Sequence, residues 1–249
     1  FWLHVWMLPW LLLAIWGASR LGSAITGRPS ATILLLCGAP ISVLATQALT
    51  PDLPLLALSL AGFGGLFTAE RRKHWVFALI LGSAALFRYS GLALIPLILL
   101  QGSDRTKQIK LTLWACIPIT ALLVHDWMAY DQLHLLAMMG FQSVSNTGVD
   151  MAHKAIASIA ALGGAVVLPI LCWKRPSQGL LGLAIGAGIG CTAAAWTDQS
   201  EWAAWGTVLF SAAGGATLAG SIQNKDPIDR FLLSWLGMGA LFLLCLRFS

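Results

Sequence analysis

Residues 74–101 read HWVFALILGSAALFRYSGLALIPLILLQ. A helix needs about 20 mostly apolar residues to cross a membrane, so this stretch is too long for one ordinary span and too short for two full ones. The polar group Arg88-Tyr89-Ser90-Gly91 lies in its middle. The stretch could form one long helix or two short helices that meet at this group, and the charges in the rest of the chain distinguish the two arrangements.

The composition indicates a membrane protein. Of the 249 residues, 58% are hydrophobic and only 10% are charged, whereas soluble domains carry about 25% charged residues. So few charges cannot cover the surface of a soluble globule, which excludes a cytosolic enzyme and a disordered chain. The formal net charge of +5 does not indicate nucleic-acid binding, because the basic residues form short clusters between apolar runs. We expect an all-α, polytopic transmembrane helical bundle that forms a single domain over residues 1–249.

Further apolar runs of membrane-spanning length flank residues 74–101 on both sides. They cover residues 3–19, 31–49, 53–69, 111–129, 156–172, 180–196, 203–220 and 231–247.

The placement of basic residues favours two crossings within 74–101. With two crossings, 12 of the 15 Lys and Arg residues lie on one side of the membrane. These are Arg20, Arg28, Arg71, Arg72, Lys73, Arg105, Lys107, Lys110, Lys174, Arg175, Lys225 and Arg230. Arg88, Lys154 and Arg247 remain on the other side, and a single crossing would instead divide the basic clusters between both sides. Because cytoplasmic loops are enriched in Lys and Arg, we predict about ten crossings, with the basic loops in the cytoplasm.

The sequence also supports expectations about one loop and about the two chain ends. Residues 130–155 form the only long loop, on the non-cytoplasmic side, and loops of this length are often functional. The chain begins at Phe1 inside an apolar run and stops at Ser249 just after another. We expect both ends to continue in a longer protein.

Asp52 is the first candidate site residue. It lies in Thr50-Pro51-Asp52-Leu53-Pro54-Leu55, at the non-cytoplasmic junction of two predicted spans. An acidic residue with nearby prolines is typical of a helix start. The alternative is a functional carboxylate at the membrane boundary, able to accept a proton, bind a metal or orient a hydroxyl.

These residues resemble a known family. The Thr-Pro-Asp-Leu-Pro-Leu turn is followed by a span, a basic turn and then residues 81–92, LGSAALFRYSGL. This pattern resembles the GT-C class of polyprenyl-phosphate-sugar-dependent glycosyltransferases, in particular the protein mannosyltransferase-like and aminoarabinose-transferase-like membrane enzymes. In that family a related acidic turn precedes a basic-aromatic pair that divides two short helices.

The resemblance implies an inverting sugar transfer. A sugar leaves a polyprenyl-phosphate donor and passes to a hydroxyl of a lipid, glycan or protein acceptor on the non-cytoplasmic face. Asp52 matches the family's second acidic motif and is the expected catalytic residue, while Arg88 and Tyr89 match the basic-aromatic pair and are expected to bind substrate. The family's other acidic motif precedes the first span of this chain and has no counterpart here.

Arg88 has two interpretations. It could be an interfacial residue whose charge reaches water while its stem stays among lipids. The alternative is a guanidinium that binds the lipid phosphate and stabilises the charge left as the sugar departs. Its expected location on the same face as Asp52 favours the second interpretation.

Histidines and acidic residues gather at the end of the span at 111–129. His125 and Asp126 close this span on the non-cytoplasmic side, and His134 follows in the loop. We predict that these three residues contact the substrate. A divalent metal is an alternative, although no His-x-x-x-His or Glu-x-x-His spacing supports a metal site built by the protein.

A secondary transporter or carrier of lipid-linked substrates is the alternative function. Asp52 and Arg88 would then form a substrate or proton site at a broken helix. A transporter should carry charges near the middle of several helices, but nearly all charges here fall at helix boundaries, which favours a transferase. Short loops favour a multi-pass protein of a bacterial inner membrane, surrounded by lipids.

Overall fold

The computed structural model describes residues 5–38, 51–100, 104–136, 176–196 and 201–221, together with Ser234. Within these ranges the chain is all-helical and contains no β-strand, which confirms the all-α part of the prediction. The chain forms two compact units. Unit 1 comprises Phe1–Cys37 and Ser42–Val144, and unit 2 comprises Gly38–Ile41 and Ser145–Ser249.

Three described helices are long and apolar enough to cross a membrane. They are Leu8–Ile25, Arg105–Tyr130 and Ser177–Ala195. Two more apolar helices, Asp52–Thr68 and Tyr89–Leu100, are shorter. These helices agree with a membrane protein but do not by themselves support ten crossings. The predicted span at 156–172, and all of 231–247 except Ser234, lie outside the described residues.

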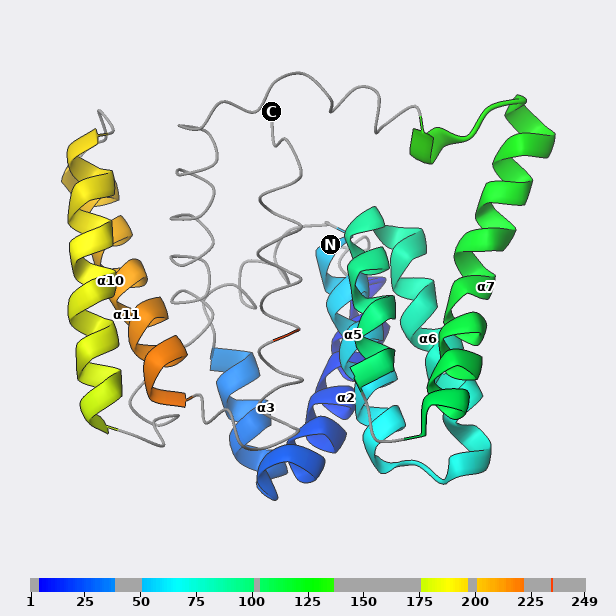
Figure 1. Ribbon diagram of the computed structural model, residues 1–249, viewed down its shortest axis with the longest axis horizontal. Helices are drawn as coiled ribbons and strands as arrows, with labels where there is room; N and C mark the ends of the chain where they lie inside the picture. The colour runs from blue at the N-terminus through cyan, green and yellow to red at the C-terminus, as the bar shows by residue number, and fades with distance from the viewer. Residues whose placement is uncertain are drawn as a thin grey trace. The chain divides into compact units, whose positions relative to one another are not determined.

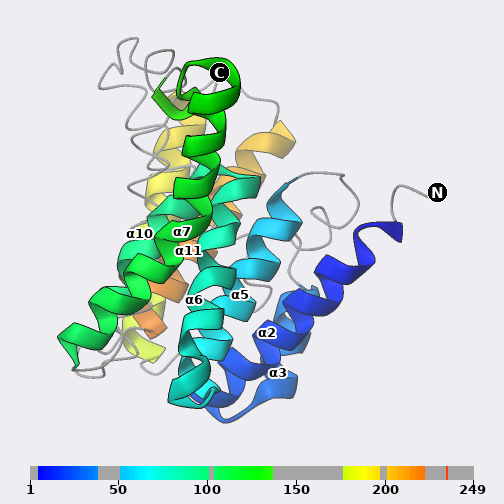
Figure 2. The same ribbon diagram turned by 90° about the vertical axis from the view of Figure 1, so that its right-hand side faces the viewer.

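Unit 1 is built on four helices that pack in the order of the sequence. They are α2 (Leu8–Thr26), α5 (Asp52–Thr68), α6 (His74–Phe87) and α7 (Arg105–Tyr130), which follow one another from right to left in Figure 2. Three shorter elements complete the unit, namely α3 (Pro29–Gly38) and the 3-10 helices η1 (Arg71–Lys73) and η2 (Tyr89–Leu100).

Small residues let these helices approach closely. A Cβ atom on Gly17 of α2 would collide with the backbone of Ala61 in α5. A Cβ atom on Gly82 of α6 would meet the carbonyl group of Ala115 in α7. Such contacts between backbones are how helices associate in lipid, where the hydrophobic effect supplies no force between them.

Residues 74–100 form two short helices, as the sequence predicts. The helix α6 ends at Phe87, and Arg88 takes an extended conformation with φ −155° and ψ 131°. The helix η2 then begins at Tyr89 and packs against α6. Only a glycine fits at Gly91, because its Cβ position lies 2.6 Å from backbone atoms of Ala84 and Ala85. Residues 74–100 are therefore a helical hairpin with Arg88 at its turn.

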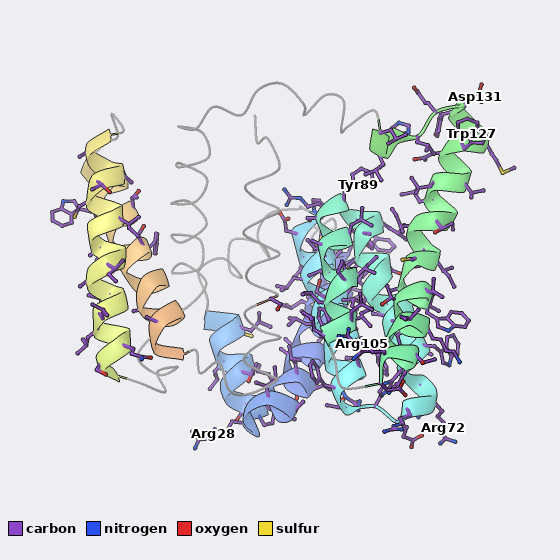
Figure 3. All side chains as sticks on the ribbon, viewed as in Figure 1. Arg28, Arg72, Tyr89, Arg105, Trp127 and Asp131 are labelled. Carbon is purple, nitrogen blue, oxygen red and sulfur yellow. The ribbon has the colours of Figure 1, made fainter. Side chains whose placement is uncertain are left out.

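Unit 1 separates the labelled basic residues from the hairpin turn. In Figure 3, Arg28 and Arg72 lie at one end of this unit, while Tyr89, Trp127 and Asp131 lie toward the opposite end. We call these the basic end and the turn end. The arrangement agrees with the separation of charges that the sequence predicts for this part of the chain.

Two helices extend beyond the predicted spans. The helix α2 ends at Thr26 rather than at residue 19, and it accommodates Arg20. The guanidinium Nε of Arg20 donates to Thr68 Oγ1 at 2.7 Å and lies over the ring of Trp16. The helix α7 begins at Arg105 rather than at residue 111, because the Asp104 side chain accepts a hydrogen bond from the first turn. Local partners thus extend both helices into polar sequence.

Unit 2 contains the described helices α10 (Pro176–Trp196) and α11 (Glu201–Ser221), which lie side by side (Figure 1). Their contact follows a row of glycines on α10. Gly182 lies against Gly215, Gly186 against Ser211, and Gly190 against Val208. These close contacts between backbones are typical of glycines spaced by four residues in membrane helices.

Candidate functional site

Asp52 and Arg88 form an ion pair at the turn end of unit 1. The Arg88 guanidinium donates from Nη1 to Asp52 Oδ1, although 36 positions separate the two residues in the chain. Their side chains are 44% and 41% exposed, respectively. The structure therefore brings together the two residues on which the sequence prediction of a site depends.

The backbone explains why both side chains reach this position. Asp52 is the first residue of α5 and follows Pro51 at its N-cap. Arg88 is the C-cap of α6, with its N–H bonded to the Ala84 carbonyl, and its own carbonyl accepts from Gly91 N–H at 2.8 Å. The start of α5 and the end of α6 are adjacent because the two helices pack in opposite directions.

Aromatic and polar groups surround the Arg88 turn. Phe87 packs edge-to-face on Trp10 of α2, with 4.9 Å between the ring centroids. Tyr89 is half-buried at the start of η2. Ser90 follows with a buried hydroxyl that has no hydrogen-bond partner among the described residues. Beside these neighbours the Arg88 guanidinium remains partly exposed.

The ion pair contributes little to the stability of the fold. Exposed ion pairs typically contribute about 0.2–1 kcal/mol, since water already solvates both groups. Close packing at Gly91 holds the hairpin independently of this pair. Within the described residues, Asp52 occupies only the Nη1 group of the guanidinium, so donors on Nη2 and Nε remain for another anion. A ligand could therefore engage the pair at a small energetic cost.

The second group of predicted site residues gathers where α7 ends. The Asp126 side chain is only 8% exposed and lies between two imidazoles. Its Oδ1 is 3.8 Å from His125 Nδ1, and its Oδ2 is 3.7 Å from His134 Nδ1. His134 can reach Asp126 because Asp131 ends the helix with a left-handed backbone at φ 55° and turns the chain back.

An aromatic ring joins the two histidines of this group. Tyr130 meets His125 edge-on with 6.2 Å between ring centroids, and His134 with 5.4 Å. In the part of the chain that is described, no group of three His, Cys, Asp or Glu side chains is close enough to hold a metal ion. The imidazoles can instead donate hydrogen bonds to a polar ligand, and the carboxylate can accept them.

The two groups of predicted residues remain separate. Within the described ranges, no hydrogen bond or ion pair joins the Asp52–Arg88 pair to the Asp126 group. Most of the long loop predicted at 130–155 lies outside the described residues, which stop at Leu136. The functional role expected of this loop therefore remains a prediction.

Sequence reasoning missed several residues of these groups. Trp10, Phe87 and Ser90 surround the Arg88 turn, and Tyr130 joins the two histidines. Tyr130 could have been found from its spacing, because it follows Asp126 by four residues on one helix face. Trp10 carries no such signal, since it lies on a helix far away in the sequence.

Comparison with known protein families, with curated proteins and with solved structures gives no match to this chain.

Proposed function

We propose that this protein is an inverting membrane glycosyltransferase that moves a sugar from a polyprenyl-phosphate donor to a hydroxyl of a lipid, glycan or protein. The contact between Asp52 and Arg88 at the hairpin turn carries this proposal. It puts a carboxylate and a guanidinium side by side, next to Tyr89, which Figure 3 shows toward the end of unit 1 opposite Arg28 and Arg72. A transferase of this kind needs both groups.

Each residue of the pair has a defined role in the transfer. The bond between the sugar's anomeric carbon and the donor phosphate oxygen breaks, and the acceptor oxygen forms a new bond to that carbon. Arg88 binds the phosphate and stabilises the negative charge that grows on its oxygens. Asp52 orients the acceptor hydroxyl and takes its proton. Asp52 also holds the guanidinium in position before the donor binds.

The remaining polar residues contribute to substrate binding. Tyr89 lies directly beside Arg88 in the chain and contacts the donor. His125, Asp126 and His134 offer donors and an acceptor to the sugar or the acceptor molecule. No divalent metal is required by these roles.

The proposal includes a topology. The chain crosses a bacterial inner membrane about ten times, with the basic end of unit 1 in the cytoplasm and the turn end on the other side. The distribution of 12 of the 15 basic residues supports this orientation. Donor and acceptor then meet on the non-cytoplasmic face.

The decisive experiment measures sugar transfer. The purified protein in liposomes is given a polyprenyl-phosphate donor with a radiolabelled sugar and, in separate reactions, a lipid, a glycan and a protein acceptor fraction. We expect label in the acceptor with wild-type protein and a loss of at least 100-fold with Arg88→Ala. Arg72→Ala serves as the matched control, because it removes an exposed Arg at the basic end. Absence of wild-type transfer to lipid, glycan and protein acceptors alike would refute the proposal.

One observation favours a transporter as the second candidate. A helix broken at a charged residue, as at Arg88 between α6 and η2, is a common feature of transporter binding sites. The same liposomes distinguish the two functions. A transporter would move labelled lipid-linked sugar across the bilayer without forming a new glycosidic bond.

A further inference from the structure

The basic end of unit 1 carries a local excess of positive charge. Six cations come from η1 and from the start of α7. Two carboxylates lie beside them, on the N-cap residues Glu70 and Asp104. The cations are Arg71, Arg72, Lys73, Arg105, Lys107 and Lys110.

Both carboxylates are already engaged. Glu70 Oε2 pairs with Arg72 Nε at 2.5 Å. Asp104 Oδ1 accepts from the backbone N–H of Lys107 at 3.1 Å, which caps α7. Within the described ranges, Arg71 has no anionic partner, and the only carboxylate that acts on the Lys107 charge is this capping Asp104.

Arg71 lies in η1, directly before α6, and Lys107 lies in the first turn of α7, which packs against α6. The positive charge of Arg71 acts directly on the ammonium group of Lys107, and packing partly removes that ammonium from water. Two like charges held together by the fold form a site at which an anion relieves the repulsion.

An aromatic pair lies further along the chain from each cation, on the packed helices α6 and α7. The rings of Trp75 in α6 and Trp114 in α7 are 5.4 Å apart, and both residues are more than two-fifths exposed. Trp75 follows Arg71 by four residues, while Trp114 follows Lys107 by seven, or about two helical turns. The aromatic pair therefore lies farther from the basic end of unit 1 than the two cations do.

We propose that Arg71, Lys107, Trp75 and Trp114 form a binding site for an anionic phospholipid. The phosphate lies between the guanidinium and the ammonium, and the glycerol and upper acyl chains lie on the two indole rings. Trp side chains prefer the depth of lipid headgroups, where an apolar ring and a polar N–H both find partners. Basic groups between membrane helices are known to suit anionic headgroups. The exposed indoles favour a lipid over a free phosphate ion, which would leave them without a function. This site is independent of the proposed sugar transfer.

Native mass spectrometry of the whole protein in detergent tests this site. Phosphatidylglycerol is titrated against phosphatidylcholine, which has the same chains and no net charge. We expect retention of phosphatidylglycerol only, and a loss of affinity of about 30-fold in the double variant Arg71→Gln/Lys107→Gln. The control Arg28→Gln/Arg72→Gln removes two charges from the same end and should retain the lipid.

Trp114→Leu separates a lipid site from a simple phosphate site. We expect it to weaken phosphatidylglycerol binding at least threefold while both charges remain. Unchanged lipid binding in this variant, together with displacement of the lipid by millimolar inorganic phosphate, would identify a free phosphate site and overturn the proposal. Equal losses of phosphatidylglycerol affinity in the control and in the Arg71/Lys107 double variant would also overturn the proposal. They would show that the lipid is attracted by the overall positive charge of this end and not by a defined site.

Discussion

Asp52 at the start of α5 and Arg88 at the end of α6 form an ion pair across 36 positions of the chain. The pair is half-exposed and stabilises the fold only weakly. Substitution of either residue should therefore change activity much more than stability. The two effects can be measured separately on the same variants.

Replacing Asp52 with Asn keeps the size of the side chain but removes its charge. We expect Asp52→Asn to lower the turnover of sugar transfer by about 100-fold or more, the range of a lost general base. The measurement is transfer of radiolabelled sugar with expression matched. Asp131→Asn is the control, because Asp131 is an exposed acidic residue at the turn end and Asn also tolerates its left-handed backbone. A wild-type rate for Asp52→Asn would leave Asp52 as a helix-start carboxylate only.

The planar fork of Arg88 should matter as well as its charge. Arg88→Ala is expected to reduce kcat by about 100- to 1,000-fold, as for loss of one donor to a developing charge. Arg88→Lys should lose less, because it keeps the charge without the fork. If the two residues act together, the double variant Asp52→Asn/Arg88→Ala should lose less than the product of the single losses. Strictly multiplicative losses would argue that they act independently.

The hairpin turn should depend on Gly91. We expect Gly91→Ala to destabilise the protein by about 1–3 kcal/mol, because the new methyl group would overlap the α6 backbone. Gly188→Ala should have the opposite effect, stabilising by about 1 kcal/mol, since its Cβ would meet open space on α10. Thermal unfolding in detergent measures both. Equal melting temperatures for Gly91→Ala and wild type would contradict the close packing of η2 on α6.

The two ends of unit 1 should lie on opposite sides of the membrane. Single cysteines are introduced as Arg72→Cys and Asp131→Cys after the five native cysteines have been replaced. A membrane-impermeant maleimide added outside intact cells should label the cysteine at 131 and not the one at 72. Permeabilised cells, in which both must react, provide the control. Labelling of both from outside would refute the topology.

His134, whose imidazole lies beside the Asp126 carboxylate, should affect substrate binding rather than the chemical step. We expect His134→Gln to raise the KM by roughly tenfold with little change in kcat, about the effect of losing one hydrogen bond to a charged group. His74→Gln is the control, because His74 lies at the basic end and contacts the Ala69 carbonyl. A loss confined to kcat would assign His134 to proton transfer instead.

The sequence predicts the helical hairpin better than it predicts contacts between helices. The position of the turn could be found because Arg88-Tyr89 interrupts an apolar run and the flanking basic clusters require both ends on one side. The contact between Asp52 and Arg88 could be expected only as a shared membrane face. It depends on how α5 packs on α6, where Gly62 lies against Leu81. Sequence alone does not encode that packing in a readable pattern.

Helix ends were harder to predict for a physical reason. Hydropathy places the end of α2 before Arg20, yet Thr68 and Trp16 bind this guanidinium from within unit 1 and the helix continues. The approach of His134 to Asp126 depends on the left-handed backbone of Asp131. A positive φ is uncommon outside glycine, so this turn had no clear signal in the sequence.

The shortness of the hairpin has a consequence for the surrounding bilayer. The helix α6 has 14 residues and is therefore about 21 Å long, whereas the hydrocarbon layer is about 30 Å thick. In the proposed topology, an upright α6 with its basic end at one surface would place Arg88 about 9 Å beneath the other surface. Water would then have to reach the half-exposed Arg88–Asp52 pair, or the bilayer would have to thin around it. A polyprenyl phosphate drawn into this depression would approach Arg88 while its tail stays among the acyl chains.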